Sequence, residues 1–119
     1  MAIETIDDPV TFIRNSGGLH DTRVQSLDFS IENETFIMVT DDLNANFADL
    51  PEYPGQRPCK IVLRQVSKLL LDLETFDGLW ISAATVTKLP GDVLLVEIDT
   101  NSGAKSIRAE FKALEIHDV

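Results

Sequence analysis

The sequence predicts an all-β fold with a short N-terminal helix, an antiparallel β-sandwich or open barrel of about six to seven strands. Segments in which apolar and polar residues alternate recur roughly every 10 to 14 residues, and turn-forming residues rather than long helices separate them. The 119 residues, 44% of them hydrophobic and 25% charged, are enough for a single globular domain over 1–119 with its own core.

One short helix is expected before the first strand. Asp7 or Asp8 can cap its N-terminus, and Pro9 suits the first helical position. Gly17 and Gly18 then end the helix. Because a helix of about two turns is not stable alone in water, we expect it to cover an edge or an end of the sheet.

The clearest local pattern is a hairpin, with strands over 23–31 and 35–40 joined by a turn at 32–34. The first strand alternates between apolar and polar residues and is therefore expected to be half-buried. Its apolar face holds Leu27, Phe29 and Ile31. Val24 has the opposite phase, so we expect a β-bulge near Gln25.

Later segments complete the predicted sheet. The further strands are expected over 60–66, 79–86, 93–100 and 105–116. In the last of these the apolar phase flips after Ala113, which predicts a bulge or twist there. Residues 67–76 fit a strand, with Leu69 and Leu71 alternating, and also a helix that would include Phe76; we favour the extended interpretation.

The loop over 41–58 is the best candidate for a functional surface. It is long for a connection in a compact domain, and such loops tend to carry function or structure of their own. The candidate partner-binding residues are Asp41, Asp42, Asn44, Phe47, Asp49 and Tyr53. Phe47 fits an exposed contact as well as an anchor of the loop on the core. An EF-hand calcium loop is excluded, because Phe47 stands where that loop needs Gly and Tyr53 where it needs Glu.

Gly17, Gly18, His20 and Asp21 form the turn that leads into the first strand. A histidine beside a carboxylate can act as a general base or bind a metal ion. Adjacent side chains usually point in different directions, so we favour a structural role, with Asp21 accepting backbone N–H bonds and His20 bonding a nearby strand. No catalytic residue and no metal ligand is assigned, and no cofactor is expected.

The charge balance narrows the choice of partner. The chain has 20 acidic and 10 basic side chains and a formal charge of −10. Such a surface repels nucleic acids and anionic membranes and attracts a basic protein. Cys59 is the only cysteine, which excludes an intrachain disulfide. A reducing, cytoplasmic location is therefore expected, since no signal segment is recognised either.

Two segments carry a resemblance to a known group of proteins. Residues 19–27 (LHDTRVQSL) resemble a pattern of an aromatic residue or Leu, His-Asp, two residues and Val-x-Ser. That pattern opens a group of small bacterial proteins, mostly of unknown function, some of them classed as polymorphic-toxin immunity proteins. The positions similar to the group's central strand segment are 60–66 (KIVLRQV), Leu69, Leu71 and Phe76. Leu19 stands where the group often has an aromatic residue, and the 41–58 loop has no counterpart in it.

The resemblance implies a binding protein, since an immunity protein blocks a toxin by covering it and an acidic face suits a basic nuclease. The leading hypothesis is a non-enzymatic, immunity-like protein-interaction module that binds a basic protein through the 41–58 loop. One alternative is a metal-binding protein or an enzyme that uses His20 and Asp21. Another is a homo-oligomeric module, such as a homodimer, joined through a strand edge or the loop.

Overall fold

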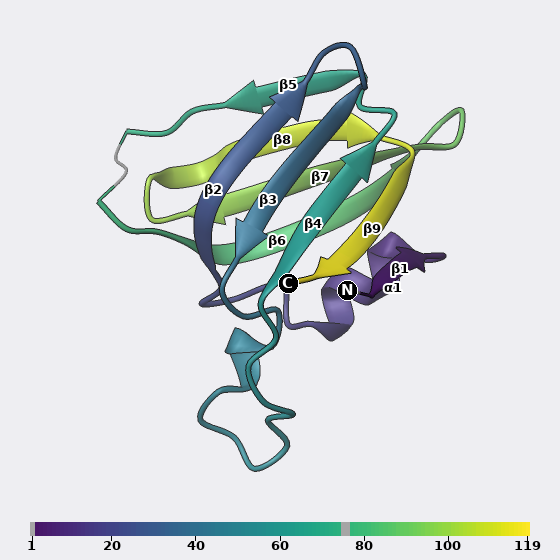
Figure 1. Cartoon of the computed structure of the whole chain (residues 1–119). Helices are drawn as coiled ribbons and strands as arrows, with labels where there is room; N and C mark the ends of the chain where they lie inside the picture. Colours follow the sequence, from purple (N-terminus) through teal and green to yellow (C-terminus); the bar gives the residue numbers. More distant parts are fainter. Residues whose placement is uncertain (1, 75–76) are drawn as a thin grey trace.

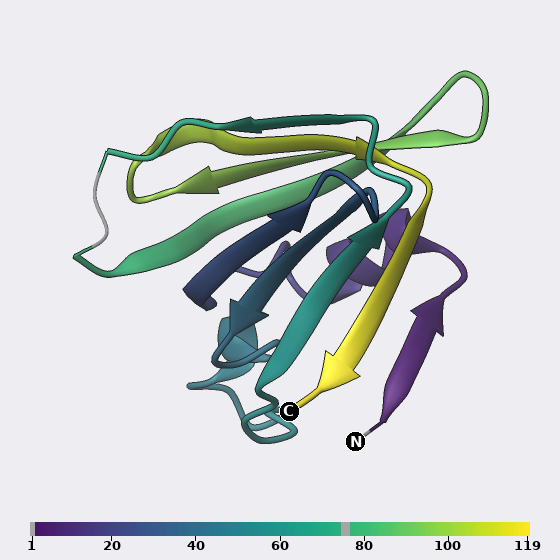
Figure 2. The ribbon, with the colours of Figure 1, turned by 45° about the horizontal axis from the view of Figure 1, so that its top comes forward.

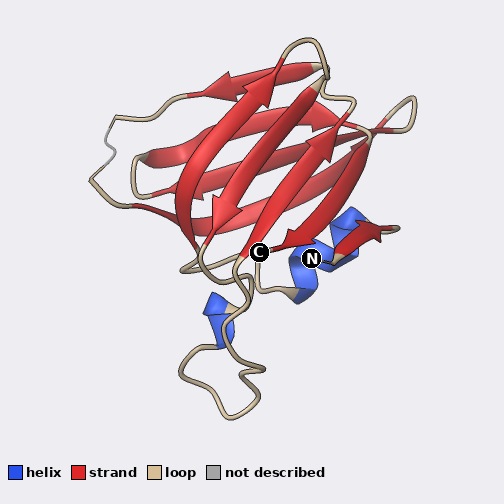
Figure 3. Cartoon of the chain, viewed as in Figure 1, coloured by secondary structure: helices blue, strands red, loops and turns tan. Residues whose placement is uncertain are grey.

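The structure is a computed structural model that describes residues 2–74 and 77–119. Over these residues the chain forms an open, antiparallel β-sheet with one short α-helix, which confirms the predicted fold class (Figure 1, Figure 3). No helix in this part of the chain is long and apolar enough to cross a membrane.

The elements follow one another as hairpins with few interruptions. In chain order they are β1 (Ile3–Ile6), α1 (Pro9–Asn15), β2 (Arg23–Ser30), β3 (Thr35–Thr40), the 3-10 turn η1 (Ala45–Phe47), β4 (Cys59–Arg64), β5 (Lys68–Leu71), β6 (Leu79–Leu89), β7 (Val93–Thr100), β8 (Gly103–Phe111) and β9 (Ala113–Asp118). The described residues thus form nine strands rather than six or seven. The sequence did not predict β1, because four residues are too few to show a period.

The sheet bends into two layers around one core. Its strand order is β1-β9-β4-β3-β2-β6-β7-β8-β5. Figure 2 shows the layer of β6, β7, β8 and β5 above the layer of β2, β3, β4 and β9. Apolar side chains from both layers, such as Phe36 from β3 and Phe111 from β8, are fully buried between them. Burial of this apolar surface is the main term that stabilises the fold.

At one corner the chain passes twice between the layers. β4 leads into β5 there and β8 leads into β9, and the two crossings hydrogen-bond to each other: the Lys112 N–H donates to the Arg64 carbonyl over 3.1 Å, and the Ser67 N–H donates to the Glu110 carbonyl over 2.9 Å. The predicted continuous strand over 105–116 is therefore wrong. The phase flip beside Ala113 marks the point where the chain changes layer.

Helix α1 begins and ends as predicted. The Asp8 carboxylate accepts hydrogen bonds from the Thr11 N–H and the Thr11 hydroxyl, and Pro9 occupies the first turn. Gly17 follows the helix with φ of +73°, and a Cβ atom there would lie 2.1 Å from Nδ2 of Asn46. Only glycine fits at this position, both for its backbone conformation and for the close approach of the 41–58 loop.

Residues 68–71 are extended, as favoured for the 67–76 segment, and pair with β8. Phe76, on which the helical alternative relied, lies outside the described residues. In β2 the predicted bulge is present, because the pairing register with β3 shifts between Val24 and Ser26. The turn after β2 closes with a hydrogen bond from the Glu34 N–H to the Ile31 carbonyl.

The predicted burial of the β2 face is wrong for two of its three residues. Phe29 is 55% exposed and Ile31 is 86% exposed. The reason lies in the topology: β2 pairs with β6 only at Arg23 and Val24 and then separates from it. No described strand covers the rest of β2 on that side, so side chains on its core face remain open to solvent.

Candidate functional site

The turn between α1 and β2 is fastened to β6 by its backbone. The Asp21 N–H donates to the Ile81 carbonyl over 2.9 Å, and the Ala84 N–H donates to the Gly18 carbonyl over 2.8 Å. These bonds lie on either side of the bulge that β6 has between Ile81 and Ala83. The turn therefore fixes where β2 begins and where it first meets β6.

The side chains of His20 and Asp21 lie on the outside of this turn. Nδ1 of His20 is 3.3 Å from Oδ2 of Asp21, so the expectation that the two diverge is wrong. Asp21 has a left-handed φ of +68°, which places its carboxylate near the imidazole. Both side chains are at least half exposed, and no group of three or more His, Cys, Asp or Glu residues in the described chain is arranged to hold a metal ion. An exposed pair of this kind contributes little to stability.

Asp42 organises the 41–58 loop from within. It is only 7% exposed, and its Oδ1 accepts hydrogen bonds from the backbone N–H groups of Asn44 and Arg57 over 2.9 and 3.0 Å. Its Oδ2 accepts from the Tyr53 hydroxyl over 2.6 Å, and that bond raises the pKa of Tyr53 to about 12. The Asn44 amide in turn donates to the Gly55 carbonyl. Asp42, Asn44 and Tyr53, all candidate partner-binding residues, thus hold the loop in shape.

Of the remaining candidate residues of the loop, Asp41 and Phe47 are held within the fold and Asp49 is exposed. Asp41 accepts a hydrogen bond from the Arg23 N–H over 2.9 Å, which ties the loop to the start of β2. Phe47 is partly buried in the 3-10 turn, whereas Asp49 is exposed beside Leu50 at the tip of the loop. Of the predicted partner-binding residues, Asp49 therefore has an exposed carboxylate with no hydrogen bond or ion pair to another described residue. Asp41, Asp42, Asn44 and Tyr53 instead form hydrogen bonds within the chain.

Cys59 and His117 lie on the paired strands β4 and β9, where Cys59 is buried and His117 contacts a carboxylate. Cys59 is fully buried, and this burial raises the pKa of its thiol, so the reactive thiolate form is disfavoured. Nε2 of His117 is 2.8 Å from the Glu115 carboxylate, which also accepts a hydrogen bond from Arg64 over 2.7 Å. These two contacts lower the pKa of Glu115.

A different surface, not anticipated from the sequence, lies between the open edges of β2 and β5. We call it the seam. Its apolar lining consists of Val24, Leu27, Phe29, Ile31, Val66, Leu69, Leu71, Leu73 and Leu79. Figure 1 shows β5 beside the upper part of β2, at the opposite end of the molecule from the 41–58 loop.

The seam residues on both strands belong to the core face of the sheet. Directly opposite residues of an antiparallel pair point to the same face. Phe29 lies opposite the fully buried Phe36 on β3, and Leu71 lies opposite the fully buried Ile107 on β8. Phe29 and Leu71 are nevertheless 55% and 37% exposed. They are core-facing side chains that no described part of the chain covers.

Two adjoining hollows give the seam its shape. One, of about 730 Å³, lies between the β2–β3 turn and the start of β5. The other, of about 410 Å³, lies farther along β2 near Val24 and reaches Gly78 and Leu79. Leu71 lines both hollows, so the two lie next to each other along the edge of β2.

Acidic residues lie on the chain segments that flank these hollows, and one of them, Glu34, lines the larger hollow. In addition to Asp77, five acidic residues lie on the β2–β3 hairpin and on the segment after β5: Asp28, Glu32, Glu34, Asp72 and Glu74. All five are exposed, and none forms an ion pair with another residue that the structure describes. Lys68, the cation at the mouth of the larger hollow, is already paired with Glu110 over 3.4 Å. The field around the seam is therefore negative.

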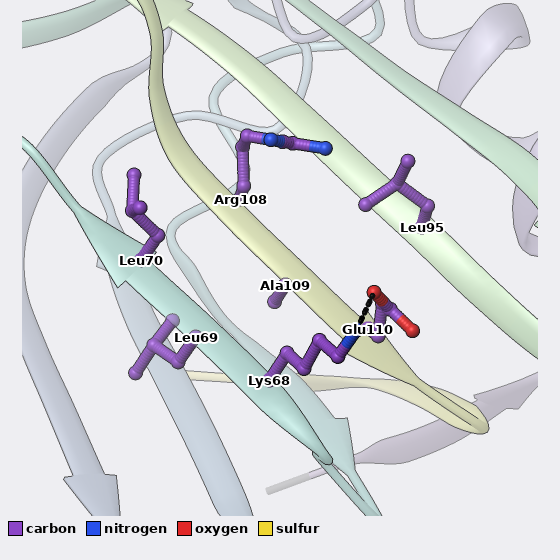
Figure 4. Close-up of a pocket in the computed structure, with 7 residues that line it drawn as sticks. All are labelled: Lys68, Leu69, Leu70, Leu95, Arg108, Ala109 and Glu110. Atoms are coloured by element: carbon purple, nitrogen blue, oxygen red, sulfur yellow. Dashed lines mark ion pairs between the residues drawn. The ribbon is translucent and has the colours of Figure 1, made fainter.

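The outer face of β5 is chemically different from the seam. A groove of about 360 Å³ lies there. Figure 4 shows Lys68, Leu70 and Arg108 among the side chains that line it. Each of its cations faces a carboxylate: Lys68 pairs with Glu110, and Nε of Arg108 lies 3.3 Å from Glu97. Because these charges are balanced within the chain, this groove has little unsatisfied charge to offer a ligand.

Comparisons with protein-family models, with curated proteins and with solved structures return no match. Function therefore has to be inferred from the residues of the seam and of the 41–58 loop.

The seam left a partial signal in the sequence. The alternation correctly placed Leu27, Phe29 and Ile31 on one face, and Leu69 and Leu71 on one face. Periodicity shows which residues share a face but not whether another strand lies over it. The additional hint was the charge pattern, because three carboxylates stand within 28–34, next to that apolar face.

Proposed function

We propose that this protein is a non-enzymatic protein-binding module and that the seam is where it takes a basic partner. The observation that carries the proposal is a strip of partly exposed, core-facing side chains, including Phe29 and Leu71. Five exposed acidic residues on the flanking segments form no ion pair with another described residue. Protein interfaces combine an apolar centre with a polar rim in this way. The acidic rim would speed association with a basic protein and restrict the choice of partner.

The resemblance to immunity proteins is consistent with this proposal. The similar segments are 19–27 and 60–66, and they lead into β2 and toward β5, the two strands that border the seam. An immunity-like role would be to cover a basic toxin. We place this role in the reducing cytoplasm, since the fully buried Cys59 is a free thiol that forms no disulfide.

The tip of the 41–58 loop is the second candidate surface. Leu50 is 46% exposed there, next to the exposed Asp49 and Glu52. The tip of this loop projects beyond the end of the sheet where β2 begins, away from the larger hollow of the seam at the other end of β2 (Figure 1). The two surfaces can therefore be changed independently, and each serves as the control for the other.

The test compares two double variants that remove equal charge. Asp28→Asn/Glu32→Gln neutralises the rim of the seam, and Asp49→Asn/Glu52→Gln neutralises the loop tip. Each protein is immobilised and exposed at low ionic strength to a lysate of the cells that encode it, and the retained proteins are identified by mass spectrometry. We expect a basic protein to be retained by the wild type and the loop variant and lost by the seam variant.

Two results would contradict the proposed site. Equal retention by all three proteins would show that the rim carboxylates do not contribute to binding. Loss with the loop variant alone would move the site to the 41–58 loop. If the expected retention is seen, it should also weaken at high ionic strength, because exposed charges are screened over ~10 Å at 0.1 M salt.

A further inference from the structure

Both strands that border the seam have an unpaired edge. β2 pairs along its length with β3 on one side, but on the other side it pairs with β6 only at Arg23 and Val24. Residues 25–30 have no strand beside them there in the described chain. Within the described residues, β5 pairs with β8 and with no second strand. Backbone N–H and C=O groups on such open edges are ready to pair with another extended chain.

We propose that the partner enters the seam as an extended segment that pairs with the open edge of β2 and so adds a strand to the sheet. This inference rests on the proposed function, because it names how the same site takes its partner. Strand addition of this kind draws affinity from backbone hydrogen bonds and specificity from alternate side chains. The added strand would fill the place that β6 leaves when it separates from β2 after Val24.

The two faces of β2 define the side chains of that segment. Phe29 lies on the core face, so inward-pointing residues of the segment must be apolar to cover it and Leu71. Asp28 is next to Phe29 on β2 and points to the opposite face, while Glu32 and Glu34 of the adjoining turn are exposed and Glu34 lines the larger hollow. Outward-pointing residues of the segment are therefore Lys or Arg. Because side chains alternate along a strand, the segment alternates apolar and basic residues.

The charge of the chain disfavours a second copy as the occupant. Each copy has a formal charge of −10, and pairing two β2 edges would bring their Asp28 carboxylates into one small region. Like charges facing each other across a strand pair are destabilising. β2 itself also offers only Arg23 as a basic residue, at its first position. A basic amphipathic strand from another protein can form the same backbone hydrogen bonds with the β2 edge without this repulsion.

The test uses a synthetic peptide as long as β2 in which Val and Lys alternate, with blocked termini. Binding to the full-length protein is measured by calorimetry at low ionic strength, and amide hydrogen exchange is followed residue by residue by NMR. We expect binding, with slower exchange by about tenfold or more at alternate amides within 25–30. Asp28→Asn/Glu32→Gln should weaken binding by about fivefold, whereas Asp49→Asn/Glu52→Gln should leave it unchanged.

Peptide controls isolate the backbone contribution. A peptide of the same composition with Val and Lys in separate blocks keeps the charge but loses the alternation, and an alternating peptide N-methylated along one edge loses the donors on that edge. Both should bind more weakly than the alternating peptide, by about tenfold or more. Phe29→Ser should also weaken binding while the protein stays folded, since Phe29 is largely exposed.

Each remaining outcome has a defined meaning. Binding without slower exchange at 25–30 would overturn strand addition but leave the proposed function standing. No binding of the alternating peptide would also overturn the inference, while the lysate comparison still decides the proposed function separately. Slower exchange at 25–30 that depends on protein concentration, without peptide, would show that a second copy occupies the edge and would equally overturn it.

Discussion

At the scale of single residues, Asp42 decides what the 41–58 loop can do. Its two carboxylate oxygens accept three hydrogen bonds from within the loop, from the backbone of Asn44 and Arg57 and from the Tyr53 hydroxyl. A buried carboxylate needs such partners, because an unpaired one is costly to remove from water. The sequence identified the polar residues of this loop but not which of them bond to one another.

Tyr53 allows this arrangement to be tested directly. It is the only tyrosine in the chain, so absorbance of tyrosinate on raising the pH reports on it alone. Its hydrogen bond to Asp42 raises its pKa from 10.0 to about 12. The contribution of this bond to stability is therefore complete below pH 10 and is lost as the pH rises toward 12. We expect Tyr53 to ionise only in that upper range.

Substitution of Asp42 supplies the comparison. Asp42→Asn should return the pKa of Tyr53 toward the ordinary value of about 10, because the charged acceptor is gone. Asp49→Asn removes the same charge from the exposed tip of the loop and should leave the titration unchanged. A wild-type protein in which Tyr53 ionises with the ordinary tyrosine pKa of 10.0 would contradict the hydrogen bond between Asp42 and Tyr53.

At the scale of elements, β2 combines a correct prediction with an incorrect one. Its alternation, its bulge after Val24 and its turn into β3 all follow from local sequence and are present. The burial of its apolar face depends on the neighbouring strand, and β6 lies beside β2 only at its beginning. Local patterns cannot report where a partner strand separates, because that is set by the bend of the whole sheet.

Phe29 on β2 and Phe36 on β3 lie opposite each other but differ in burial, so substituting each of them tests whether Phe29 is uncovered. Phe36→Ala empties a fully buried site and should lower the free energy of unfolding by about 3–5 kcal/mol. Phe29→Ala changes the same side chain where it is 55% exposed and should cost about 1 kcal/mol or less. Urea denaturation of both variants gives the two values. Equal losses would mean that Phe29 is covered in solution.

The corner at Lys112 shows the same limit for a second element. The sequence pattern marked a phase flip beside Ala113, and the structure places β8 and β9 in different layers on either side of it. A bulge within one strand and a change of layer leave the same trace in sequence, since each moves the apolar side chains to the opposite face. The contacts of the crossing, such as the bond between Lys112 and Arg64, decide between them.

At the scale of the whole molecule, charge opposes the self-association that an open apolar edge would otherwise favour. The formal charge is −10, and five exposed acidic residues lie on the segments that flank the seam. We expect sedimentation at low ionic strength to show one species with the mass of the single chain, 13.2 kDa. A dimer under these conditions would contradict the view that repulsion protects the edge, and would favour the homo-oligomeric alternative.

The sequence by itself determined the fold class, the short capped helix, the first hairpin with its bulge and the acidic character of the surface. These features depend on contacts between neighbours in the chain or on composition alone. Only the tertiary structure decided that Asp42 and Tyr53 hold a loop together and that Phe29 and Leu71 stay uncovered. The physical reason is that burial at the seam depends on strands distant in sequence: β2 leaves β6 after Val24, β5 turns back along β8, and no described strand fills the space between them.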